Sequence, residues 1–139
     1  MLGSLLIVCA SVSGAFVTPP ENRAAQPPAL HPLEARVIEQ TNSQRARHGL
    51  PPLAVDHGLL QSARNHAAWM TNSRSMVHTN KPVGENIAMG QRSSAEVMNS
   101  WMNSSGHRAN ILSSGYTRIG VAAYTTPEGT IYWCQQFLR

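Results

Sequence analysis

The residues best suited to chemistry lie in three short segments. In the run WMNSSGHRANIL, residues 101–112, His107 directly follows a glycine, with small polar residues before it and Ile-Leu after it. This order predicts an imidazole held at a turn or at a helix start. His78 and the GENIA run at 84–88 supply a second imidazole and the carboxylate of Glu85. Two histidines and a glutamate brought together would form either a metal site or a general acid–base site.

Three kinds of chemistry are open to this set. Neutral imidazoles bind zinc, copper or nickel, and two histidines with one carboxylate match the ligand count of an open catalytic zinc site, where bound water attacks carbonyl or phosphoryl centres. Without a metal, Glu85 could orient one imidazole while the other acts as a base near the ordinary histidine pKa of about 6.5. A serine nucleophile at Ser104 or Ser105 beside His107 is the third alternative, but no nucleophile-elbow sequence is present.

Other polar and aromatic residues are expected to have structural roles. Asn86 and Asn110 could tie loops to the backbone through their amides, and Arg108 could pair with a carboxylate. Turns or close packing would explain three glycines: Gly84, Gly106 and Gly120. Buried positions are expected for a hydrogen-bonded His66, an inert Cys134 thiol and two core anchors, Trp101 and Trp133.

The apolar pattern predicts helices first and a β-hairpin last. The expected elements are a helix from Pro32–Leu33 to Gly49, a helix capped by Asp56, a strand over 83–89, a helix over 93–103, a helical turn over 107–112, and strands over 119–124 and 131–138 joined at Pro127-Glu128-Gly129. The second helix has an apolar face made of Leu59, Leu60, Ala63, Ala67 and Met70. This order of elements argues against a doubly wound parallel sheet.

The length of 139 residues and the apolar share of 42% predict one domain with an ordinary core. The only long apolar stretch, residues 2–17, is shorter than the roughly 20 residues of a spanning helix. We interpret residues 1–15 as a signal peptide, 16–32 as a Pro-rich spacer and 33–139 as the domain. A lipid anchor at Cys9 and a disordered apolar tail are the alternatives. The mature form is therefore expected to be secreted, with no transmembrane segment.

Charge and cysteine content narrow the classes of partner. The net charge is +4, and the arginines are scattered between positions 23 and 139 instead of forming a run. Scattered arginines argue against a nucleic-acid surface. Without the leader, Cys134 is the only cysteine, so the domain would be stabilised by its core and not by a disulfide.

The motifs together resemble the CAP superfamily of cysteine-rich secretory, antigen 5 and pathogenesis-related proteins, in its compact bacterial SCP-like branch. The resemblance rests on His78, the runs at 84–88 and 101–112, and the segments IGVA (119–122) and YWCQQF (132–137). It covers roughly residues 33–139. It implies an α+β fold, a three-layer α-β-α sandwich with a small, mainly antiparallel sheet between helices. It also implies internal hydrogen bonding by Asn42 and Arg45 on the first helix.

The resemblance further implies a site with two histidines and two acidic residues. His78, Glu85 and His107 match three of them, while Ser104 stands where relatives with the full set often have glutamate. We therefore predict a reduced site, with His78 and His107 as ligands of Zn²⁺ or another divalent metal and Glu85 as a third candidate ligand.

The predicted function is that of a monomeric binding module, secreted or in the cell envelope, for a lipid, peptide or envelope ligand. The alternatives are a metal-assisted hydrolase of peptide or envelope substrates and a scaffold with a vestigial site. Loss of the fourth acid shifts the prediction away from an enzyme.

Overall fold

The computed structural model describes residues 28–139, so the predicted signal peptide (1–15) and most of the predicted spacer (16–32) lie outside the described residues. The helices are α1 (Pro32–Arg47), α2 (His57–Ser73), α3 (Ser94–Met102) and α4 (Ser105–Ile111). The strands are β1 (Ala54–Val55), β2 (Gly84–Met89), β3 (Arg118–Thr125) and β4 (Ile131–Leu138). Among residues 28–139, every helix is too short or too polar to cross a membrane.

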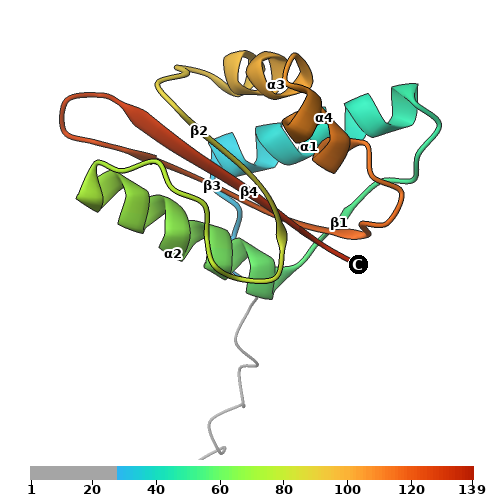
Figure 1. Ribbon diagram of the computed structural model, residues 1–139, viewed down its shortest axis with the longest axis horizontal. Coiled ribbons are helices and arrows are strands. Elements are labelled where there is room, and N and C mark those ends of the chain that lie inside the picture. The colour runs from blue at the N-terminus through green and yellow to red at the C-terminus, as the bar shows by residue number, and fades with distance from the viewer. Residues whose placement is uncertain (1–27) are drawn as a thin grey trace, which may run out of the picture.

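The sheet lies between two layers of helices (Figure 1). Its strand order is β1-β3-β4-β2; β4 pairs antiparallel with both β3 and β2, while β1 pairs parallel with β3. Helix α2 packs on one face of the sheet, and α1, α3 and α4 cover the other. This arrangement confirms the predicted α+β, three-layer fold. Strand β2 lies at an edge of the sheet, next to the loop that carries His78.

Helix starts follow the predicted caps. Asp56 accepts a hydrogen bond from the Leu59 N–H at 2.8 Å, and Ser93 accepts one from the Glu96 N–H at 3.2 Å. Each cap provides an acceptor for an N–H group that has no partner within its helix. The Glu96 carboxylate receives the backbone N–H of Arg92, the residue before the N-cap, at 2.9 Å.

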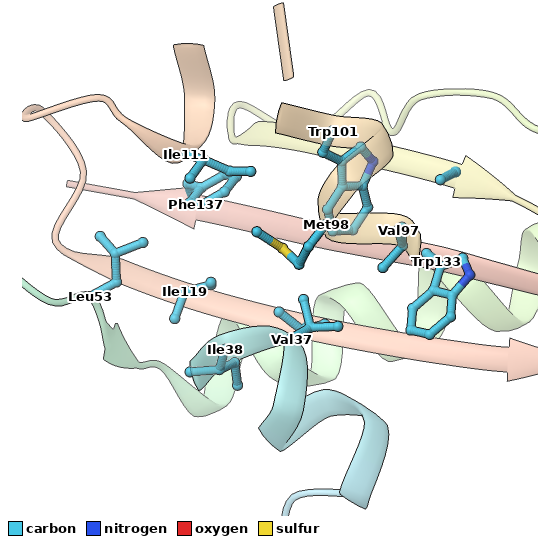
Figure 2. Close-up of a cluster of buried hydrophobic side chains, with 12 residues drawn as sticks. Val37, Ile38, Leu53, Val97, Met98, Trp101, Ile111, Ile119, Trp133 and Phe137 are labelled. Carbon is cyan, nitrogen blue, oxygen red and sulfur yellow. The ribbon is translucent and has the colours of Figure 1, made fainter. Parts of the chain in front are cut away.

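Both faces of β4 are buried, because helices cover both sides of the sheet. Trp133 and Phe137 point to the layer of α1, α3 and α4, whereas Tyr132 and Cys134 point to α2. Figure 2 shows Trp133 and Trp101 within the cluster of buried apolar side chains between the sheet and the layer of α1, α3 and α4. Both indoles are fully buried, which confirms their predicted role as core anchors. Cys134 is a buried free thiol, and burial raises its pKa well above the ordinary value, as expected for an inert cysteine.

The structure corrects several details of the predicted elements. Strand β1 was not predicted from the sequence, and α2 continues to Ser73. Arg108 contacts the imidazole of His48, at 3.1 Å, instead of a carboxylate. A Cβ at Gly106 would meet no atom within 4 Å, so close packing does not explain this glycine. At Gly84 and Gly120 an added Cβ would overlap Tyr116 and the backbone of α2, respectively, as predicted.

Candidate functional site

Glu85 accepts more hydrogen bonds than any other side chain of the predicted site. It lies on β2, faces α2 and is almost fully buried. One carboxylate oxygen receives His78 Nδ1 at 2.8 Å and the Thr79 backbone N–H at 2.9 Å. The other receives Gln136 Nε2 at 2.9 Å and the Cys134 thiol at 3.6 Å. Both oxygens are therefore engaged within the protein.

These contacts keep Glu85 ionised in spite of its burial. Burial by itself raises the pKa of Glu85, but hydrogen bonds from Gln136, the Thr79 N–H and His78, together with the charge of His66, outweigh that effect. The net result is a pKa below the ordinary value of 4.5. A buried carboxylate that accepts several hydrogen bonds is expected to behave in this way.

We expect Glu85→Gln to destabilise the domain at pH 7 by about 1–3 kcal/mol, because an amide cannot accept hydrogen bonds at both positions. The lowered folded-state pKa means that the contribution of the charge is complete above pH 4.5 and is lost as pH falls through the folded-state value. Urea unfolding should therefore show the difference in stability between the wild type and the variant shrinking as pH falls below 4.5. Glu39→Gln, on the exposed face of α1, is the control. A constant difference across this pH range would contradict the assignment.

Two imidazoles contact or approach the Glu85 carboxylate. His78 is 60% exposed, and its bond to a carboxylate, which can only accept, places the proton on Nδ1. In neutral His78 the lone pair on Nε2 is then free. His66 Nε2 bonds the Val77 carbonyl at 2.8 Å and lies 3.8 Å from Glu85 Oε2. The predicted hydrogen-bonded His66 is confirmed, and its closeness to Glu85 was not predicted.

His107 lies on α4, on the opposite side of the sheet from α2, and its backbone contacts β2. Asn86, the next residue after Glu85 on this strand, points to the other side of the sheet and donates to the His107 carbonyl at 3.1 Å. Asn110 donates to Asn86 Oδ1 at 2.9 Å and to the Glu85 carbonyl at 3.2 Å. The two asparagines thus tie α4 to β2, as predicted.

Burial lowers the pKa of His107, and the charge of His78 lowers it further. The two imidazoles therefore interact electrostatically, and His107 is neutral at pH 7. Ser104, predicted to replace an acidic group, is the N-cap residue of α4, and its carbonyl accepts the Arg108 N–H. Within residues 28–139, no three His, Cys, Asp or Glu side chains converge in an arrangement that could hold a metal ion.

A network of buried polar side chains connects the site to α1 through β4. This network was not predicted from the sequence. Gln135 on β4 accepts from Asn86 at 3.0 Å and donates to Thr41 of α1 at 2.7 Å. Its neighbour Gln136 binds Glu85 on the other face. Both amides are fully buried. Two glutamines inside an otherwise apolar strand were the available sequence signal, because buried amides require partners.

The family assignment follows from the sequence of the domain. Residues 38–137 match the Cysteine-rich secretory protein family, CAP. The chain belongs to this family. The match includes α2, α3, α4 and β1 to β3 in full and most of α1 and β4. It also includes the residues His78, Glu85 and His107.

Individual relatives agree with the assignment. The chain is 37% identical over 129 residues to the uncharacterized protein YkwD of Bacillus subtilis, a match that covers 81% of this chain and 49% of YkwD. An extracellular protein from Bacillus anthracis with an SCP domain has a similar structure, with a TM-score of 0.69 and 26% identity over 81% of this chain and 45% of that one. This chain thus spans about half the length of these two proteins.

A more distant structure shows the same fold. NaASP2, whose crystal structure was determined with Zn²⁺, is 15% identical and has a TM-score of 0.62, over 76% of this chain and 78% of NaASP2. The same fold is therefore shared at low sequence identity.

Proposed function

We propose that this protein is a secreted binding module that holds an extracellular or cell-envelope ligand beside β2, with a divalent metal on His78 and His107. The observation that carries the proposal is the bond between His78 Nδ1 and Glu85. A carboxylate that accepts one ring N–H fixes the tautomer and orientation of a histidine and makes its other nitrogen a better ligand. The extracellular relative from Bacillus anthracis supports secretion.

The chemistry of the two side chains suits a divalent metal held by imidazole nitrogens. His78 offers a free Nε2, and His107 is neutral at pH 7, the form in which imidazole binds metals. Both oxygens of Glu85 are already bonded, so its role is to orient His78 rather than to bind the metal. A bound metal would supply a Lewis acid with open positions for oxygen or nitrogen atoms of an external ligand. The crystal structure of NaASP2 with Zn²⁺ is consistent with such binding.

The hydrogen bonds and lowered pKa of Glu85, the single carboxylate of the predicted site, favour ligand binding over catalysis. Glu85 already accepts bonds from His78, Thr79 and Gln136, and its pKa lies below the ordinary value. A general base for hydrolysis needs a pKa near the working pH and access to the reacting proton. Glu85 has neither property, and Ser104 provides no second carboxylate.

We expect calorimetry at pH 7.5 to show one Zn²⁺ bound with a dissociation constant on the order of 1–10 µM. His78→Ala and His107→Ala should each weaken binding at least about tenfold, because one of two protein ligands is lost. His57→Ala, which removes an exposed imidazole at the start of α2, should bind zinc as the wild type does. Zinc binding should also weaken as pH falls, because protons compete with the metal for the imidazole nitrogens.

Two results would count against this proposal. Folded wild type that does not bind Zn²⁺ would remove the metal from it. Equal losses in His57→Ala and His78→Ala would indicate adventitious surface binding instead of a site on His78 and His107.

A further inference from the structure

Trp69 differs from the other two tryptophans of the chain in being half exposed. Trp101 and Trp133 are fully buried in the core, whereas Trp69 is 49% exposed on the outer part of α2. Its indole stacks on the His66 ring, with the ring centroids 5.8 Å apart and the planes within 9° of parallel. His66 is in turn held by the Val77 carbonyl at 2.8 Å. The indole is therefore supported on one face by a fixed ring.

This stacked pair forms part of a shallow pocket of about 420 Å³. The lining residues are His66, Trp69, His78, Thr79 and Asn80. Trp69 is the only apolar side chain among them. His78 contributes its imidazole edge, and Asn80 contributes an exposed side-chain amide. The pocket thus combines one aromatic surface with polar groups at its rim.

We infer that this pocket binds a neutral β-linked oligosaccharide, with a sugar ring against Trp69. The inference deepens the proposed function and rests on it for the role of the His78 site as a ligand-binding surface. A pyranose ring with equatorial hydroxyls has an apolar C–H face and a polar rim. Aromatic rings bury such apolar faces, and amide and imidazole groups pair with hydroxyls.

Other ligand classes match the lining less well. No carboxylate, lysine or arginine lines the pocket, so in the metal-free protein an ionic ligand would lack a fixed countercharge. A lipid chain would need an apolar enclosure, and this pocket is shallow with a single apolar side chain. Met76 and Val77 are half exposed near His66, so a membrane surface is the alternative that the experiment must separate.

The test uses chitotetraose and cellotetraose as probes with the folded chain, in EDTA and again with Zn²⁺. Binding is followed by calorimetry and by tryptophan fluorescence, which reports ligand contact mainly through the one exposed indole. We expect at least one probe to bind with a dissociation constant of about 0.1–1 mM, the range of a single small contact surface. Trp69→Ala should weaken binding at least about tenfold and Trp69→Phe less, because phenylalanine keeps a smaller ring. Tyr124→Ala, which removes another half-exposed aromatic ring from β3, should leave binding unchanged.

Each result decides the inference. Failure of both probes to bind at about 10 mM, or equal binding by wild type and Trp69→Ala, would overturn it. Trp69-dependent binding to phosphatidylglycerol vesicles without oligosaccharide binding would assign the surface to membranes and also overturn it. Oligosaccharide binding in EDTA by a protein that does not bind zinc would support the inference while the metal proposal fails. Normal zinc binding without oligosaccharide binding would sink this inference alone.

Discussion

Replacing Arg45 with alanine is expected to lower the free energy of unfolding by about 4 kcal/mol, a large part of the 5–15 kcal/mol typical of a domain. Arg45 is fully buried on α1, and it bonds four backbone carbonyls: Pro51 at 2.9 Å, Ile111 at 2.9 Å, Ser113 at 2.8 Å and Tyr116 at 3.4 Å. Removing the side chain leaves these acceptors without their donor and opens a cavity. Each unsatisfied buried group costs about 1 kcal/mol or more.

The arginine is important because of where its partners lie. The carbonyls belong to the segment after α1, to the last residue of α4 and to the turn between α4 and β3. One side chain therefore holds both connections in place. Burial lowers the pKa of Arg45, but a guanidinium remains charged in proteins. Five N–H groups in a fixed plane can serve several carbonyls, whereas an ammonium has three donors at one point. Arg45→Lys is therefore also expected to destabilise the domain, by less than Arg45→Ala.

Urea unfolding of four proteins tests this expectation: wild type, Arg45→Ala, Arg45→Lys and Arg47→Ala. Arg47 lies two residues later on α1 and is exposed, so its removal should change stability by less than about 0.5 kcal/mol. If Arg45→Ala were as stable as Arg47→Ala, the four carbonyl contacts would have no net stabilising value.

Local patterns in the sequence predicted the parts of this fold that depend on near neighbours. The caps at Asp56 and Ser93 and the alternation of the hairpin strands act over a few residues, and these elements lie where predicted. Strand β1 could not be predicted in the same way. It has two residues, and it exists because Ala54 and Val55 pair with β3 more than sixty residues later.

In the site too, local motifs were predictable from the sequence, whereas contacts between residues far apart in the chain were not. Motifs singled out His78, Glu85 and His107, but not the contacts that define what Glu85 can do. Gln136 lies 51 residues away in the chain, and only the pairing of β2 with β4 brings it to Glu85. The exposure of Trp69 was also hidden, because it sits directly beside the buried Met70 in an otherwise regular helical pattern.

Gly120→Ala is expected to destabilise the domain by about 3 kcal/mol, at the upper end of ordinary overpacking effects. Gly120 lies on β3 directly against α2, and an added Cβ would overlap the backbone of Leu59 and Leu60. Backbone atoms of a helix cannot rotate aside as a long side chain can, so α2 would have to move away from the sheet. Because α2 also carries His66 and Trp69, the same displacement should weaken the contact between His66 and Glu85.

Gly106→Ala is the matched control, since it adds the same methyl group to a different environment. A Cβ at Gly106 meets nothing within 4 Å, and the residue lies inside α4. Alanine is favoured over glycine in a helix by about 0.5–1 kcal/mol, so this variant should be slightly more stable than the wild type. Thermal and urea unfolding should therefore give opposite signs for the two substitutions. Equal small effects would mean that α2 does not pack against Gly120 as closely as the structure shows.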